Sequence, residues 1–261
     1  MLMQRQTAAR EITDRDISLT FVKGMSVLKA FDTSSTHLTL PQIARATGLD
    51  RASARRLVLT LVHLGYVKQE ERVFSLTPRI LVLASGFLQA RQFGKTIEPV
   101  LRSFSQQISD AISMAMIDGH QAVYVAHAGA DTKPVSIGFT VGSRAPLLHT
   151  AIGRALVAAC SPEQARELIA NAPLERFTES TVLDRDAIAA DVALTAKRGF
   201  AFVDGEFEAG VAAIATPVRS ESGETASLGI SGNSNRLRDE DYQNRVVDTL
   251  RECSKAVAAL L

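Results

Sequence analysis

The stretch Leu38–Val67, LTLPQIARATGLDRASARRLVLTLVHLGYV, decides the fold of the first part of the chain. Thr39 is a suitable N-cap for a short helix, and Gly48 follows the last turn of that helix. Asp50 then caps a second helix, predicted over Arg51–Leu64, whose apolar positions repeat every three and four residues. Two helices joined by a tight turn that contains glycine define a helix-turn-helix.

The flanking segments extend this motif to a winged helix. Helical spacing predicts a first helix over Phe21–Phe31. Two strands are predicted after the motif, at Tyr66–Lys68 and Val73–Leu76, with a polar turn between them. A helix, a helix-turn-helix and a hairpin in this order form a winged helix-turn-helix, which we assign to residues 17–77.

Basic and hydroxyl side chains gather on and around the second helix of the motif. The N-terminal part of a recognition helix meets base edges in the major groove of double-stranded DNA, where arginine can bind guanine through two hydrogen bonds. The predicted contacts on this helix are Arg51, Ser53, Arg55 and Arg56. Predicted phosphate contacts elsewhere are Arg45, Arg72 and Lys23. The alternative interpretation is a solvated basic surface.

Composition and charge agree with a nucleic-acid-binding module joined to a second domain. The chain has 261 residues, enough for two ordinary domains, and a net charge of +1. Residues 1–91 carry a net charge of +6, whereas residues 92–261 carry −5. No apolar run reaches the roughly 20 residues of a membrane span, so no membrane partner is expected.

The start of the chain and its cysteines indicate a cytoplasmic protein. Residues 1–16 are polar and are predicted to be a disordered tail rather than a signal peptide. Cys160 and Cys253 have neither disulfide-framework nor zinc-site spacing. We therefore expect no metal and no cofactor.

A largely apolar helix follows the winged helix, from Thr77 and Pro78 to Gln92. We interpret residues 78–93 as a linker helix that also offers a dimer face; a core helix of the first domain is the alternative. Gly94 is predicted to interrupt the helix, and Lys95–Ile108 to form the next one.

Residues 94–261 alternate between strand and helix patterns. Predicted strands are Ser113–Ile117, Ala122–Ala128, Val135–Phe139, Phe200–Val203, Ala213–Val218 and Ser227–Ser231. Predicted helices are Ala151–Ala159, Pro162–Asn171, Asp186–Arg198 and Asp239–Leu261. Strands that form hairpins, with helices at either end, predict an α+β fold with an antiparallel sheet.

The segment Gly142–Thr150, which leads into the helix that begins at Ala151, is the best candidate for a ligand site. The free N–H groups at the start of a helix favour an anion, and the guanidinium of Arg144 could bind a carboxylate. Opposite this segment we place small or hydroxyl residues: Ala212, Ala213, Ser231 and Asn233. Alternatively, Arg144 is only a surface charge.

Enzyme motifs are missing from the sequence. It contains no nucleophile elbow, no HExxH zinc motif and no phosphate-binding glycine loop. The carboxylates of Asp204, Glu206 and Glu208 could perform acid–base chemistry. A small-molecule enzyme with an accessory nucleic-acid-binding module is therefore the alternative function.

Motifs in both halves of the chain resemble the IclR (isocitrate lyase regulator) family. They are FVKGMSVLKAFD (21–32), the opening stretch, FSLTPRILVLASGFL (74–88), VGSRAPLLHTAIGRALVAA (141–159), RGFAFVDGEFEAGVAAIATPV (198–218) and ASLGISG (226–232). The resemblance implies a transcription regulator, not an enzyme, with a winged helix-turn-helix, a linker helix and a GAF-like effector domain. It also implies homodimers or tetramers on DNA, with a palindromic operator.

The resemblance further implies which residues bind the effector. Together with the loop described above, the set is Gly142, Arg144, His149, Thr150, Asp204, Glu206, Ala213 and Ser231. The loop and the GEFEAG stretch are most similar to the subgroup that senses aromatic acids such as protocatechuate or para-hydroxybenzoate. That subgroup has Arg at the position of Ala212 and Ser at that of Ala213, so a larger or less polar ligand is expected here.

Overall fold

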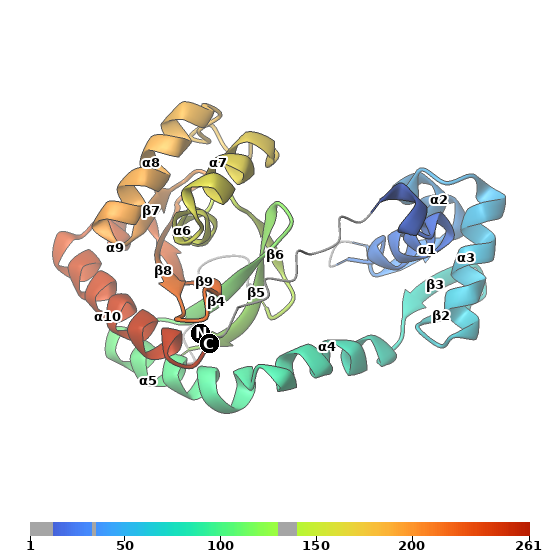
Figure 1. Cartoon of the computed structure of the whole chain (residues 1–261), viewed down its shortest axis with the longest axis horizontal. Coiled ribbons are helices and arrows are strands. Elements are labelled where there is room, and N and C mark those ends of the chain that lie inside the picture. Colours follow the sequence, from blue (N-terminus) through green and yellow to red (C-terminus); the bar gives the residue numbers. More distant parts are fainter. Residues whose placement is uncertain (1–12, 33–34, 130–139) are drawn as a thin grey trace, which may run out of the picture. The chain divides into compact units, whose positions relative to one another are not determined.

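The computed structural model describes residues 13–32, 35–129 and 140–261 (Figure 1). The chain forms two compact units, Met1–Gly86 and Phe87–Leu261. The first twelve residues of the predicted tail lie outside the described residues, and so does the strand predicted at Val135–Phe139. Asp14–Asp16 form a single 3-10 turn. No helix in the described ranges is long and apolar enough to cross a membrane.

The first unit is a winged helix-turn-helix, which confirms the prediction. Its elements are α1 (Leu19–Lys29), β1 (His37–Thr39), α2 (Leu40–Thr47), α3 (Arg51–His63), β2 (Val67–Glu70), β3 (Val73–Leu76) and the first part of α4 (Arg79–Ala90). The three strands form an antiparallel sheet in the order β1-β3-β2. Strand β1 was not predicted; its three residues pair with β3 just before α2 begins.

Local caps fix the geometry of α2 and α3. The Thr39 amide donates to Gln42 Oε1 at 2.8 Å, and Gly48 ends α2 with a φ of 66°, a conformation that glycine adopts without strain. Asp50 Oδ1 accepts a hydrogen bond from the Ser53 amide at 2.9 Å and so caps α3. The inner face of α3 packs into the core of the unit through Ala54, Leu57, Val58 and Leu61.

The second unit is built on a six-stranded antiparallel sheet with helices on both faces, which confirms the α+β prediction. Its strands are β4 (Ile112–Asp118), β5 (Gln121–Ala128), β6 (Arg144–Pro146), β7 (Ala201–Asp204), β8 (Val211–Arg219) and β9 (Thr225–Asn233), in the order β6-β5-β4-β9-β8-β7. Its helices are a π-helical turn (Phe93–Ile97), α5 (Glu98–Ile108), α6 (Ala151–Ala159), α7 (Pro162–Asn171), α8 (Arg185–Arg198), α9 (Ser234–Leu237) and α10 (Glu240–Ala258).

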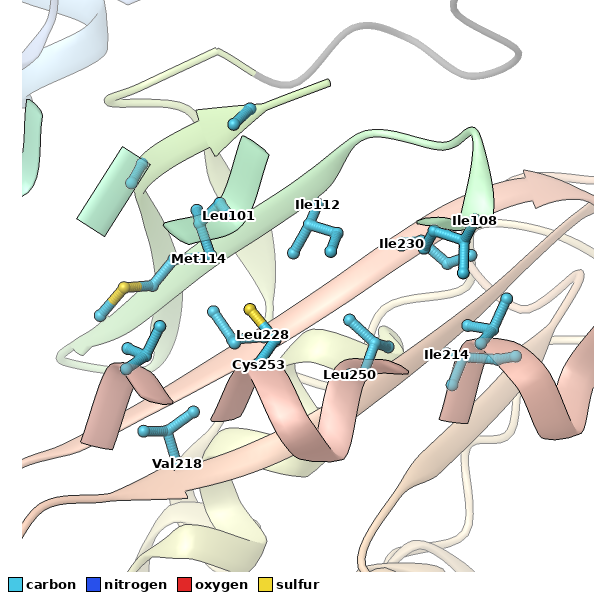
Figure 2. Close-up of a cluster of buried hydrophobic side chains, with 14 of the residues drawn as sticks. Leu101, Ile108, Ile112, Met114, Ile214, Val218, Leu228, Ile230, Leu250 and Cys253 are labelled. Atoms are coloured by element: carbon cyan, nitrogen blue, oxygen red, sulfur yellow. The ribbon is translucent and has the colours of Figure 1, made fainter. Parts of the chain in front are cut away.

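Two hydrophobic cores lie on the two faces of this sheet. Helices α5 and α10 cover one face, where Leu101, Ile112, Leu228, Leu250 and Cys253 meet (Figure 2). Helices α6, α7 and α8 lie on the other side (Figure 1). Because side chains alternate along a strand, consecutive residues of β8 serve different cores.

Two local predictions were wrong. Gly94 does not interrupt the helices at the start of the unit, because it lies inside the π-helical turn. The break falls at Gln92, whose φ of 52° is left-handed. The segment 142–148, for which no strand was predicted, contains the short strand β6, which pairs with β5.

Gly153 allows α6 to lie directly against the segment that precedes it. A Cβ atom at this position would stand 2.3 Å from the carbonyl oxygen of Leu147 and 2.5 Å from its Cα. Both partners are backbone atoms of a fully buried residue, so neither can move away cheaply. The contact therefore holds the start of α6 in place.

We expect Gly153→Ala to lower the free energy of unfolding by about 1–3 kcal/mol, the usual cost of forcing extra atoms into a packed core. Gly94→Ala is the matched control, because nothing lies within 4 Å of a Cβ built there. Urea denaturation of both variants measures the difference. If the unfolding curves of the two variants coincide, the close approach of Gly153 to the Leu147 backbone does not constrain the position of α6.

Candidate nucleic-acid interface and ligand cavity

The outward face of α3 carries a row of arginines. Arg51, Arg55 and Arg56 are exposed, while the opposite face of the helix is buried in the core of the unit. Arg51 and Arg55 are four residues apart and so share one side of the helix. Within the described ranges no carboxylate forms an ion pair with any of the three guanidinium groups. Their charge is therefore available to a polyanion.

The remaining predicted DNA contacts lie on other parts of the first unit. Arg45 is exposed in the last turn of α2, Lys23 is exposed on α1, and Arg72 is exposed in the turn between β2 and β3. Ser53 differs from these, because it is half-buried and hydrogen-bonds to the α3 cap. Hydrogen bonds from its side chain and amide hold the pKa of Asp50 below its usual value.

The second unit contains a cavity of about 60 Å³ between the sheet and the start of α6. Its lining consists of Ser113, Tyr124, His149, Thr150, Ala151, Ile152, Val203, Glu206, Phe207, Glu208, Val211, Ala213, Ile214, Gly229, Ile230 and Ser231. The walls are mainly aliphatic and aromatic. A few polar groups interrupt them, as is typical of sites for small organic ligands.

His149 is the most unusual group in the wall. Its side chain is fully buried, and neither ring nitrogen has a hydrogen-bond partner in the described part of the protein. Burial, and secondarily the positive charge of Arg154, lower the pKa of His149 to about 4, so the ring is neutral at pH 7. Because an unsatisfied buried polar group costs about 1–3 kcal/mol, such a ring is suited to binding a polar ligand atom.

Two aromatic rings lie next to His149 in sequence of contact, and of these Phe207 lines the cavity. Phe177 packs edge-on against His149 with ring centroids 5.5 Å apart, and Phe207 packs against Phe177 at 5.0 Å. These contacts hold the imidazole from one side through ring packing.

The N-terminus of α6 opens onto the same cavity. Thr150 is the N-cap; its hydroxyl accepts from the Gly153 amide at 3.1 Å and donates to the Pro146 carbonyl at 2.7 Å. The first amides of a helix have no partner within the helix, and here those of Ala151 and Ile152 belong to cavity-lining residues. Their partial positive charge favours an anionic ligand atom.

A buried arginine on α6 holds Glu206, another residue of the cavity wall. Arg154 donates to the Leu148 carbonyl at 2.9 Å, to Asp191 on α8 at 3.1 Å and to Glu206 at 2.7 Å. Burial raises the pKa of Glu206, and the charge of Arg154 opposes that shift. The cavity thus has two acidic side chains, Glu206 and Glu208, and no lysine or arginine among its described lining residues.

The structure brings five of the eight predicted effector residues to the cavity: His149, Thr150, Glu206, Ala213 and Ser231. The other three, Gly142, Arg144 and Asp204, lie elsewhere.

Each of these three residues has another role. Gly142 is in an exposed turn with a φ of 92°, and its amide donates to the Tyr124 carbonyl at 2.8 Å. Arg144 is half-exposed and forms an ion pair with Asp118 at 3.0 Å. Asp204 lies in a neighbouring open cleft, where it contacts Ser234 and Arg238.

The two alanines of β8 also separate. Ala213 lines the cavity, whereas Ala212 points into the core on the opposite face of the sheet. Of the two alanines, only Ala213 can therefore affect the size of the cavity directly.

Sequence reasoning missed Tyr124, Phe207 and the anchoring role of Arg154. A signal for Arg154 was present, since it is the one charged residue of the apolar helix AIGRALVAA. Nothing in the strand patterns distinguished Tyr124. In the described ranges no three His, Cys, Asp or Glu side chains cluster as metal ligands.

Comparison with known proteins gives matches over nearly the whole chain. Residues 20–71 match the IclR helix-turn-helix domain, and residues 86–259 match the bacterial transcriptional regulator IclR C-terminal family. The Pca regulon regulatory protein of Pseudomonas putida is 31% identical, over 93% of this chain and 84% of its own. The p-hydroxybenzoate hydroxylase transcriptional activator of Acinetobacter baylyi is 29% identical, over 97% of this chain and 96% of its own.

Solved structures agree with these matches. A Rhodococcus sp. RHA1 protein described as a transcriptional regulator superposes with a TM-score of 0.75 and 32% identity, over 94% of this chain and 98% of that one. A double mutant of the PobR inducer-binding domain from Acinetobacter, in complex with 3-hydroxybenzoic acid, superposes with a TM-score of 0.57 and 26% identity. It covers 63% of this chain and 96% of the other.

We expect Arg154→Met to lower the free energy of unfolding by about 3–5 kcal/mol at pH 7, because it leaves the buried carboxylate of Glu206 without its cationic partner. The loss of the guanidinium removes the charge that opposes the raised pKa of Glu206. In this variant the folded state keeps a proton on Glu206 at pH values where the unfolded chain, in which Glu206 has its ordinary pKa of 4.5, has released it. The free energy of unfolding therefore falls as the pH rises above 4.5. The deficit should therefore be smaller at pH 5 than at pH 8.

Thermal unfolding at both pH values measures this effect. Arg144→Met is the matched control, because its half-exposed ion pair contributes at most about 1 kcal/mol. Equal deficits for the two variants would show that Arg154 is not the anchor of the cavity wall.

Proposed function

Because the chain belongs to the IclR family of bacterial transcriptional regulators, we propose that it binds operator DNA through α3 and responds to an aromatic acid held at the start of α6. The observation that carries the second part is His149, a fully buried imidazole with two unsatisfied nitrogens in the wall of a mostly apolar cavity.

For DNA binding, we propose that α3 enters the major groove. Arg51, Arg55 and Arg56 reach base edges or nearby phosphates, as arginines at the start of a recognition helix do. Ser53, near the N-cap of α3, is a further DNA contact in this proposal. The further basic residues Arg45, Lys23 and Arg72 bind phosphates. The net charge of +6 on residues 1–91 supports this assignment.

We further propose that the protein acts as a homodimer on a palindromic operator in the cytoplasm. Helix α4, the proposed linker, exposes Leu81, Val82, Leu83 and Phe87, which a second copy of the chain could cover. Matched half-sites then follow from the two-fold symmetry of the dimer.

For the effector, we propose that its carboxylate binds the amides of Ala151 and Ile152 together with an N–H of His149. This places the carboxylate at α6 rather than at Arg144, whose guanidinium already pairs with Asp118 outside the cavity. The aromatic ring of the effector packs among the apolar walls, and hydroxyl groups on it donate to Glu206 or Glu208. A regulator named for p-hydroxybenzoate hydroxylase and a domain solved with 3-hydroxybenzoic acid support this class of ligand.

The enzyme alternative receives less support. Asp204 is held by Ser234 and Arg238, and Glu206 is held by Arg154, so both carboxylates have structural partners. The matching relatives are named as regulators. We therefore propose that the protein is not an enzyme.

Arg55→Ala and Arg56→Ala should each weaken operator binding by about 1–3 kcal/mol for a lost base contact. Gel-shift titration measures this, with an operator selected from random DNA by the wild-type protein. His63→Ala is the control, because His63 is also exposed on α3 but lies at its other end. If both arginine variants bind the operator as tightly as His63→Ala does, α3 is not the recognition helix.

A thermal-shift screen tests the effector. At a hundredfold excess over its dissociation constant, 4-hydroxybenzoate or 3,4-dihydroxybenzoate should stabilise the protein by about 3 kcal/mol, and benzoate at the same concentration should stabilise it less. His149→Phe keeps a ring against Phe177 but removes both nitrogens, so the response should disappear. Arg144→Gln should respond like the wild type. A full response in His149→Phe, or none with any aromatic acid, would contradict the assignment.

A further inference from the structure

The end of α4 is tied to the hairpin formed by β8 and β9. Arg91, the residue after α4, forms an ion pair between its Nη1 and Oε1 of Glu224. Both side chains are largely buried, with 33% and 23% of their surfaces exposed. Arg91 also lies over the ring of Phe87, 5.4 Å from its centroid. The guanidinium is therefore held between its own helix and the hairpin.

The same hairpin forms part of the cavity wall. Ala213 on β8 and Gly229–Ser231 on β9 line the cavity, and the two strands pair continuously from Val211 to Arg219. At about 3.3 Å per residue, the stretch from Glu224 to Ser231 spans roughly 23 Å. The paired strands thus connect the ligand cavity to the ion pair as one stiff element.

The hairpin turn holds Glu224 in a defined place. The Glu224 amide donates to Ser220 Oγ at 3.0 Å, and the Glu224 carbonyl accepts from the Ser220 amide at 2.9 Å. Because both backbone groups are bonded to the facing strand end, a displacement of the strands is passed to the Glu224 carboxylate.

On the other side of the ion pair the backbone changes conformation. Gln92 has a φ of 52°, which is rare for a residue other than glycine, and a π-helical turn follows it. Phe93 in that turn is buried in the same core as Val218 and Leu228 of the hairpin. The end of α4 is thus followed by a non-standard backbone segment, is joined to the hairpin by an ion pair, and shares a buried core with it through Phe93.

We propose that the Arg91–Glu224 ion pair couples occupancy of the cavity to the DNA-reading unit through α4. The proposal rests on the proposed function, since it assigns a route between its two sites. A ligand that contacts Ala213 and Ser231 biases the position of the β8–β9 hairpin, and the ion pair passes this bias to the end of α4. Arg91 and Glu224 are positioning residues, because neither lines the cavity.

The test measures two quantities for each variant. One is its affinity for the effector, and the other is the change in its operator affinity that the effector causes. The wild type, Arg91→Gln, Glu224→Gln and the charge-exchanged double variant Arg91→Glu/Glu224→Arg are titrated with 4-hydroxybenzoate, and their operator affinity is measured with and without it. Glu221→Gln is the matched control on the same turn, since Glu221 is exposed and forms no ion pair among the described residues.

We expect both single variants to bind the effector within about twofold of the wild type, while the effector-induced change in operator affinity falls at least about fivefold. The double variant should recover most of that change, because it restores the ion pair with its charges exchanged. A purely structural role for the two side chains would not produce this recovery. Glu221→Gln should behave like the wild type.

Single variants that keep the full change in operator affinity would overturn the coupling role. So would a loss of effector binding in the same proportion as the loss of response, because the ion pair would then act on the cavity itself. A wild type that binds the operator but ignores every aromatic acid would instead overturn the proposed effector, and the coupling inference with it.

Discussion

The buried guanidinium of Arg154 is the interaction on which the ligand site depends. It joins three segments that are distant in the sequence: the approach to α6 at Leu148, helix α8 at Asp191 and the loop after β7 at Glu206. A buried charge of this kind is tolerated only when it is paired and its hydrogen bonds are met. All three nitrogens of the guanidinium have such partners here. The shape of the cavity therefore follows from electrostatic requirements as much as from apolar packing.

The two units use charge in opposite ways. On α3 the arginines are exposed and have no acidic partner in the described ranges, so their charge is directed outward. In the second unit, Arg154, Arg198 and Arg91 have acidic partners. The first arrangement favours association with a polyanion, whereas the second orders the fold around a small site. This difference is the structural counterpart of the charge asymmetry along the sequence.

Elements governed by local rules could be predicted from the sequence. Thr39, Gly48 and Asp50 mark the ends of α2 and α3 because capping and left-handed turns depend on residues next to each other in the chain. The bounds of α6, Ala151–Ala159, were also predicted from the local sequence. The short strand β1 was missed because it exists only through pairing with β3, a contact between distant residues.

Contacts that depend on tertiary packing could not be predicted. Arg144 and Arg154 are both arginines near the start of α6, and only their tertiary contacts distinguish the exposed one from the buried one. The separation of Ala212 from Ala213 depends on the register of β8, and a shift of one residue would exchange them. The backbone break at Gln92 rather than Gly94 also had no local signal, since glycine is the residue expected to adopt a positive φ.

The neutrality of His149 has a consequence for the charge of a ligand. Attraction of an anion to the start of α6 relies on a helix end, worth about half a positive charge, and on an uncharged imidazole. Glu206 and Glu208 stand in the same wall. A ligand with a second negative charge would find no lysine or arginine among the described lining residues to pair with it. Under the proposed function, this wall suits a single carboxylate on an apolar body.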